Sequence, residues 1–351
     1  MDMNQGFEIT LQAHSMVQLA VPVVESTHVG YVRRVVVKLA RDLGFSDTAA
    51  GKVAIVVNEL AGNLVKHSTQ GQVLVRSLQR EETCGIEIMA LDKGPGMVEI
   101  TKCLQDGYST TGSPGTGLGA VARLSALFDI YSTPGVGTAV LAQLWAMPWS
   151  GKDKRHHMEI GAVCLPHPQE EVCGDVWEYL ECPGRSLIFL ADGLGHGPAA
   201  SDAAREARRT FRENPLLAPA DIIVKAHSAL HATRGAAVAI AVLEHADSVV
   251  HYCGVGNISA AILSQQSRRG MISHSGIVGH QVRKTQEFTY PFVKDALLVM
   301  HSDGLGSRWS LEPYPGIQSR HQGLIAGVLY RDYRRGGDDV TVLVAQPRNK
   351  Y

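Results

Sequence analysis

The chain has 351 residues, enough for two domains of ordinary size that each bury a core. Hydrophobic residues make up 45% and charged residues 19%, which is typical of globular rather than disordered protein. Lys and Arg together number 33 against 34 Asp and Glu, so no basic excess points to nucleic acid, and we expect no nucleic-acid partner.

The amino terminus and the cysteines bear on the compartment. The opening MDMNQGFEIT lacks a charged start followed by an apolar core, so we expect no signal peptide. No apolar stretch approaches the roughly 18 residues that span a bilayer, so we expect no membrane partner. The six cysteines form no C-x-x-C pair and are expected to be reduced thiols. These features predict a cytoplasmic protein.

The first half predicts a strand, two long helices, two strands, a short helix and two more strands. Their ranges are 8–13, 27–43, 48–67, 71–78, 85–92, 119–128, 129–133 and 137–145. Apolar residues at helical spacing define the helices, with Ser26 as the expected cap of the first and Ser46 or Asp47 as that of the second. A polar stretch with a proline and a glycine, 148–157, is the predicted linker between domains 1–147 and 158–351.

The second half has a different order of elements. Predicted strands are 158–165, 173–181, 186–192, 236–243, 248–254, 258–264, 295–302 and 339–346, and predicted helices are 198–213, 220–233 and 321–333. Strands follow strands and helices follow helices, which predicts an α+β fold rather than alternating βαβ units.

Three polar residues lie on one face of the helix predicted at 48–67. Glu59, Asn63 and His67 are spaced i, i+4 and i+8. They are either polar residues at a helix edge or ligands, because a carboxylate beside an amide can hold hydrated Mg²⁺ and orient a nucleophile.

Two glycine-rich motifs follow. Asp92 ends a strand and precedes Gly94 and Gly96, which let backbone approach a ligand while the carboxylate meets its amino group. A second motif opens a helix, where backbone N–H groups and the helix dipole form a phosphate cradle. Its residues are Gly115, Thr116, Gly117, Leu118 and Gly119. It fails the Walker pattern, and no strand directly precedes it, which disfavours a dinucleotide fold.

Together these motifs resemble the GHKL ATPase family over nearly all of residues 1–147, and the run 106–124 looks like the switch kinase of the bacterial stressosome pathway. The resemblance implies an α/β sandwich, a mixed sheet covered by helices on one face, that binds ATP with Mg²⁺ and phosphorylates serine on STAS-domain proteins. It implies Glu59 as general base, Asn63 as Mg²⁺ ligand and Asp92 as reader of adenine, with His67 and the glycines also in the site. A histidine kinase is not expected, because only about 25 residues precede the first helix, too few for a dimerising hairpin.

Acidic residues mark the strand ends of the second half. Asp175, Asp192, Asp303 and the pair Asp338–Asp339 adjoin predicted strands. Any one of them is compatible with an ordinary turn. Several carboxylates gathered at strand ends instead suit two hard divalent cations that share a water.

Residues 158–351 resemble the SpoIIE-type branch of the protein phosphatase 2C superfamily, most specifically in Asp-Gly-x-Gly-His-Gly at 192–197. The resemblance implies a β-sandwich flanked by helices that holds two Mn²⁺ or Mg²⁺ ions. The implied ligands are Asp175, Asp192, the Gly193 carbonyl, Asp303 and Asp338, with Asp339 as second choice. The family has two glycines before its first Asp, whereas Cys173 precedes Gly174 here.

Other residues admit two interpretations. His196 is either a general acid for the leaving serine oxygen or a loop residue bonded to backbone. The run Gly254-x-Gly256-Asn257 is interpreted as a structural turn, and the pair His156–His157 as part of a solvated linker. Arg331, Arg334 and Arg335 either steer a phosphorylated substrate or are ordinary surface charge.

These features predict a bifunctional enzyme of a bacterial partner-switching pathway, an ATP-dependent serine kinase joined to a metal-dependent phosphatase, with STAS-domain proteins as partners. The alternative is a module that captures a sigma factor or STAS protein under control of ATP. Glu59 favours catalysis, because capture alone needs no base. A small-molecule ATPase or hydrolase lacks a deep-pocket signature. The oligomeric state and the choice between Mn²⁺ and Mg²⁺ are left open.

Overall fold

A computed structural model describes residues 18–68, 70–80, 83–105, 117–147, 157–264 and 267–348. Contacts divide the chain into two compact units, one of Met1–Phe128 with Pro134–Trp149 and one of Asp129–Thr133 with Ser150–Tyr351. The strand predicted at 8–13 and nearly all of the predicted linker lie outside the described residues. Within the described ranges, no helix is both long and apolar enough to cross a bilayer.

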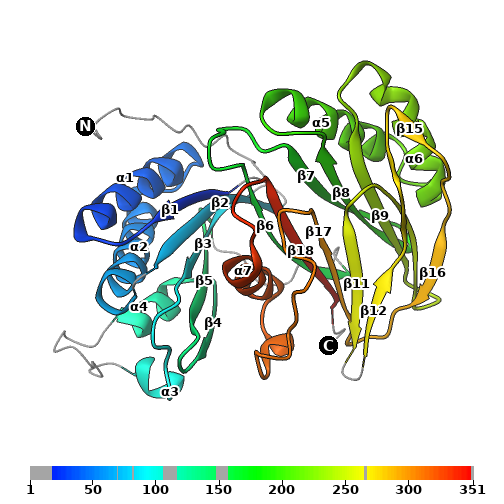
Figure 1. Ribbon diagram of the computed structural model, residues 1–351. Coiled ribbons are helices and arrows are strands. Elements are labelled where there is room, and N and C mark those ends of the chain that lie inside the picture. The colour runs from blue at the N-terminus through cyan, green and yellow to red at the C-terminus, as the bar shows by residue number, and fades with distance from the viewer. Residues whose placement is uncertain are drawn as a thin grey trace. The chain divides into compact units, whose positions relative to one another are not determined.

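The first unit is built on a five-stranded sheet of order β1-β2-β3-β5-β4, although residues 129–133 of its edge strand β4 are grouped with the second unit. The strands are β1 Leu19–Pro22, β2 Gln72–Arg80, β3 Thr83–Leu91, β4 Leu127–Thr133 and β5 Gly137–Trp145. Pairings β1–β2, β2–β3 and β3–β5 are antiparallel. We expected a mixed sheet, but this part of it is purely antiparallel. Helices α1 Ser26–Asp42, α2 Asp47–His67 and α4 Gly117–Leu124 lie on one face of it (Figure 1), and α3 Ile100–Cys103 is a single turn.

Helix α2 carries the predicted polar residues and begins where the sequence predicts. The Ser46 hydroxyl accepts a hydrogen bond from the Ala49 N–H at 3.3 Å, which caps the helix. Ser26 is not a cap, because it is already the first residue of α1 and Glu25 precedes it. Helix α4 begins two residues before the predicted start of 119, so Gly117, Leu118 and Gly119 form its first turn.

The second unit is a sandwich of two sheets with orders β13-β10-β9-β8-β7, to which β16 adds beside β10, and β12-β11-β17-β18-β6. The first holds β7 Asp175–Cys182, β8 Arg185–Gly193, β9 Ala236–Glu244, β10 Val249–Val255, β13 Ser273–His274 and β16 Phe288–Pro291. The second holds β6 Met158–Leu165, β11 Ser259–Ser264, β12 Ser267–Met271, β17 Leu297–His301 and β18 Val340–Pro347. Strands β14 Gly276–Ile277 and β15 Gln281–Val282 pair separately. Strands β12 to β16 were not predicted from the sequence.

Helices cover the outer faces of the sandwich (Figure 1): α5 Pro198–Glu213 and α6 Pro219–Ala229 lie on the first sheet, and α7 Gln322–Tyr333 on the second. The predicted α+β fold class is confirmed. Gly161 of β6 lets α7 approach closely, because a Cβ there would lie 1.8 Å from the Gly323 nitrogen.

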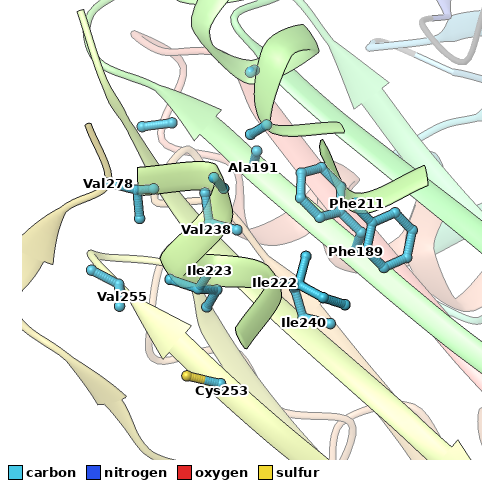
Figure 2. Close-up of a cluster of buried hydrophobic side chains, with 14 of the residues drawn as sticks. Phe189, Ala191, Phe211, Ile222, Ile223, Val238, Ile240, Cys253, Val255 and Val278 are labelled. Atoms are coloured by element: carbon cyan, nitrogen blue, oxygen red, sulfur yellow. The ribbon is translucent and has the colours of Figure 1, made fainter. Parts of the chain in front are cut away.

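A hydrophobic core fills the space between α5, α6 and the first sheet (Figure 2). Phe189 of β8 stacks on Phe211 of α5 with ring centroids 4.9 Å apart, and Ile222 and Ile223 of α6 are fully buried beside them. Burial of each such side chain stabilises the fold by about 1.5–3 kcal/mol. This core fixes β8 and its partner β7, whose ends carry Asp192 and Asp175.

Candidate functional sites

The acidic residues of the second unit meet at one end of the two sheets. Asp175 and Asp192 are directly opposite each other in the antiparallel β7–β8 pair. Asp303 follows β17, and Asp338 and Asp339 precede β18, its antiparallel neighbour. Two antiparallel strand pairs, β7–β8 and β17–β18, therefore bring together carboxylates from distant parts of the chain.

Hydrogen bonds join these carboxylates across the sandwich. The buried Ser302 hydroxyl donates to Asp175 Oδ2 at 2.6 Å and accepts from the Thr341 N–H at 2.9 Å. The Asn257 amide donates to Asp303 Oδ2 at 2.8 Å, and the His167 N–H donates to Asp339 Oδ1 at 2.9 Å. Each bond fixes the direction of one carboxylate.

The cluster is electrostatically strained without cations. Burial, and then the charges of the other acids, raise the pKa of Asp192 to about 9. Burial, with Asp339 adding to it, raises the pKa of Asp175 to about 7, although the Ser302 hydrogen bond opposes the change. Asp175 Oδ1 and Asp339 Oδ2 are buried and have no hydrogen-bond partner among the described residues. Buried oxygens and mutually repelling carboxylates of this kind fit hard divalent cations.

Two glycines leave room for this arrangement. A Cβ on Gly174 would lie 2.6 Å from Asp339 Oδ2, and one on Gly193 would lie 2.0 Å from the Ala200 carbonyl oxygen. The unusual Cys173 is accommodated in the core, where its sulfur lies 3.7 Å from that of Cys164. All six cysteines are among the described residues, and none of them forms a disulfide.

His196 belongs to a small polar cluster beside the acids. Its Nδ1 lies 2.7 Å from Glu170 Oε1, and its ring stacks on His167 with centroids 4.6 Å apart. The side chain is half exposed. Its hydrogen-bond partner is therefore a carboxylate, rather than the backbone group considered from the sequence.

The nucleotide motifs of the first unit also converge. A Cβ on Gly117 would lie 2.8 Å from Glu59 Oε2 and 4.0 Å from Asn63 Nδ2, so the start of α4 adjoins both side chains. His67 on the next turn of α2 is exposed, and its carbonyl packs against Gly94.

The Asp92 carboxylate is held by backbone. Its Oδ1 accepts from the N–H groups of Gly94 at 2.7 Å and Thr138 at 3.2 Å. Gly96 has a left-handed φ of 70°, which a side chain would disfavour. Gly115 and Thr116 lie outside the described residues.

Sequence reasoning missed several contacts of the acid cluster. Asn257, interpreted as part of a structural turn, contacts Asp303. Ser302 and His167 belong to no motif: Ser302 only precedes Asp303, and His167 only follows β6. Arg331 is not surface charge, because its side chain is 3% exposed and pairs with Asp332 at 2.6 Å. Arg334 and Arg335 are exposed, as the surface interpretation expects. His157 does not lie in a solvated linker: its ring contacts Glu181 and His245.

Comparison with known proteins supports two domain types. The family model of the histidine kinase-like ATPase domain matches residues 23–144, and that of stage II sporulation protein E matches residues 183–348. The chain is 35% identical over 107 residues to the serine/threonine-protein kinase RsbT of Bacillus subtilis, covering 30% of this chain and 80% of RsbT. It is 23% identical over 155 residues to the phosphoserine phosphatase RsbX of Bacillus subtilis, covering 44% of this chain and 77% of RsbX.

Among solved structures, the chain is similar to one from the bacterial stressosome, described as a modular system adapted to control secondary messenger signalling. The TM-score is 0.51 at 25% identity, and the match covers 54% of this chain and 100% of the other.

Proposed function

Since the chain belongs to the RsbT family of serine/threonine-protein kinases through its first half and carries a SpoIIE-type phosphatase domain in its second, we propose that it is a bifunctional enzyme of a partner-switching pathway. In this proposal residues 1–147 transfer phosphate from ATP to a serine of a STAS-domain protein. Residues 158–351 remove phosphate from phosphoserine or phosphothreonine, and 148–157 link the two.

The observation that carries the phosphatase half is the group of buried, mutually repelling carboxylates with two orphaned oxygens. Asp175, Asp192, Asp303 and Asp338 hold two Mn²⁺ or Mg²⁺ ions, with the Gly193 carbonyl as a further ligand. When bound, two such cations would activate a water molecule and stabilise charge on a phosphoryl group. Asp338 is preferred because the family's Asp-Asp-x-Thr pattern puts its ligand first. Asp339 is the second choice: its Oδ1 accepts from the His167 N–H, which leaves the buried Oδ2 for a cation.

The surrounding residues position these ligands and handle the proton. Ser302 and Asn257 orient Asp175 and Asp303 through the hydrogen bonds described above. Glu170 holds Nδ1 of His196, which leaves Nε2 as the nitrogen that protonates the departing serine oxygen.

The kinase half rests on the contact of Gly117 with Glu59 and Asn63. Glu59 accepts the proton of the substrate hydroxyl, Asn63 holds Mg²⁺, and the first turn of α4 meets the phosphates. Asp92, fixed by two backbone N–H groups, reads the adenine amino group. Asp92→Asn is expected to weaken ATP binding severely, because an amide can present a donor where an acceptor is needed.

The test uses labelled ATP, the full-length protein and the STAS-domain proteins encoded in its own genome. Asp303→Asn should let phosphorylated partner accumulate, and Glu59→Ala should only remove phosphate from partner phosphorylated beforehand. Exposed neighbours supply matched controls: Asp295→Asn and Asn58→Ala should behave as wild type. Should Asp303→Asn leave every STAS partner unphosphorylated, the kinase assignment fails. The first domain would then be a module that captures a STAS protein or sigma factor and delivers the phosphatase.

A further inference from the structure

Three metal-binding side chains meet at another place in the second unit. His157 lies just before β6, Glu181 is near the end of β7, and His245 follows β9. One nitrogen from each imidazole and one carboxylate oxygen all lie within 4.8 Å of one another. His157 Nδ1 lies 2.7 Å from Glu181 Oε1, and His245 Nε2 lies 3.5 Å from the same oxygen.

The three side chains are held in place by their neighbours. The Ser186 hydroxyl lies within hydrogen-bond distance of both Glu181 oxygens, at 3.1 and 3.0 Å, and of His245 Nε2, at 2.8 Å. The Tyr179 hydroxyl also donates to Glu181. The two imidazole rings stack with centroids 4.0 Å apart. Glu181 is only 13% exposed, so its carboxylate is directed inward toward the two rings.

This group is separate from the acid cluster. Asp175 opens β7 and Glu181 lies six positions later on the same strand, which corresponds to about 20 Å of extended chain. The His245 N–H is bonded to the Gly184 carbonyl, and the Arg348 N–H to the His157 carbonyl. The group therefore lies where the β7–β8 turn, the β9–β10 turn and the start of β6 come together, with β6 belonging to the opposite sheet.

We propose that His157, Glu181 and His245 form a binding site for one transition-metal cation, with Zn²⁺ as the best match. Two imidazoles and one carboxylate are a ligand set typical of Zn²⁺, whereas Mg²⁺ prefers oxygen ligands alone. Ser186 and Tyr179 supply the outer hydrogen bonds that orient the carboxylate, as metal sites require. The role of the cation is structural: it links the start of β6, in one sheet, to the β7–β8 and β9–β10 turns of the other sheet.

The site is tested by titrating Zn²⁺, and Co²⁺ as its spectroscopic substitute, into chelator-treated full-length protein in excess Mg²⁺. Excess Mg²⁺ is included to fill the proposed carboxylate site, since this ion prefers oxygen ligands and does not compete for imidazole. We expect one equivalent of Zn²⁺ to remain after gel filtration, and Co²⁺ to give the visible absorption of a nitrogen-ligated site. His245→Ala and His157→Ala should each weaken this binding by at least about tenfold.

Controls separate a metal site from a plain ion-pair network. His251→Ala is the matched control, since His251 Nδ1 lies 3.0 Å from Glu287 Oε1 in a pair without a second histidine, and its metal binding should equal that of wild type. His157 is 38% exposed, so His157→Ala should fold even if His245→Ala does not, and it should keep full phosphatase activity. Absence of bound Zn²⁺ in wild type, or the same stoichiometry and affinity in His157→Ala, would overturn the proposal.

Discussion

Ser302→Ala probes how the fold positions a ligand of the acid cluster. The hydroxyl donates to Asp175 Oδ2 at 2.6 Å and accepts from the Thr341 N–H at 2.9 Å, and it is fully buried. A hydrogen bond to a charged group is worth about 1.5–3 kcal/mol, which corresponds to about 10- to 150-fold in an equilibrium constant. We therefore expect the Mn²⁺ concentration that half-saturates phosphatase activity to rise by about that factor, while kcat at saturating Mn²⁺ changes much less.

The same substitution leaves the Thr341 N–H buried without its acceptor, which costs about 1–3 kcal/mol and lowers Tm by several degrees. The assay is hydrolysis of p-nitrophenyl phosphate at graded Mn²⁺, with Tm measured in chelator. Thr210→Val is the control, because it removes a buried hydroxyl that bonds only a helix carbonyl. If Ser302→Ala lowers Tm but leaves the half-saturating Mn²⁺ unchanged, Ser302 is a structural residue and the positioning argument is wrong.

Three further predictions concern the nucleotide site, the pH dependence and the thiols. Gly117→Ala should reduce phosphoryl transfer at least tenfold, since the new Cβ meets Glu59 Oε2, while Gly62→Ala, which meets nothing within 4 Å, should leave kinase assays unchanged. The folded-state pKa of Asp192 is raised to about 9, so this group stabilises the folded state relative to the unfolded one below about pH 4, and that contribution is lost as pH rises through 9. In chelator, Asp192→Asn should therefore melt several degrees above wild type at pH 9, and added Mn²⁺ should reverse the order; an unchanged order in melting curves contradicts the assignment. Cys164, Cys173 and Cys253 are buried, and burial raises the pKa of Cys173 and Cys253, so a thiol reagent should label Cys84, Cys103 and Cys182 first and reach the other three only on unfolding.

Local patterns allowed much of the fold to be predicted from the sequence. Helix α2 and strands such as β5 and β6 carry strong periodic or continuous apolar runs, and they lie within a residue of the predicted bounds. Strand β12, SRRGM, is mostly exposed and polar, so it lacked the apolar signal of a strand and forms only because β11 provides a partner. The helix predicted from 119 begins at Gly117 instead, although glycine disfavours helix.

The candidate sites were predictable only in part, because a local motif identifies a residue but not its partners from distant parts of the chain. Each Asp at a strand end was visible, because a local motif surrounds it. The contacts from Ser302 to Asp175 and from His157 to Glu181 join segments with no common motif, and only strand pairing brings them together. The sequence pattern favours Asp338 over Asp339 as the cation ligand. The hydrogen bonds of Asp339 do not decide between the two, so Asp338 stays a proposal.

Asp175 pairs with Asp192 in one sheet, whereas Asp303 and the acids before β18 adjoin the β17–β18 pair of the other, and this division has a kinetic consequence. The two halves of the acid cluster come from strands that are far apart in sequence, so the complete binding site forms only after most long-range contacts have formed. Cations should therefore bind after the rate-limiting step of folding and slow unfolding far more than they accelerate folding. The second domain would then owe its lifetime in the cell to the concentration of free divalent cations, with its folding rate nearly independent of them.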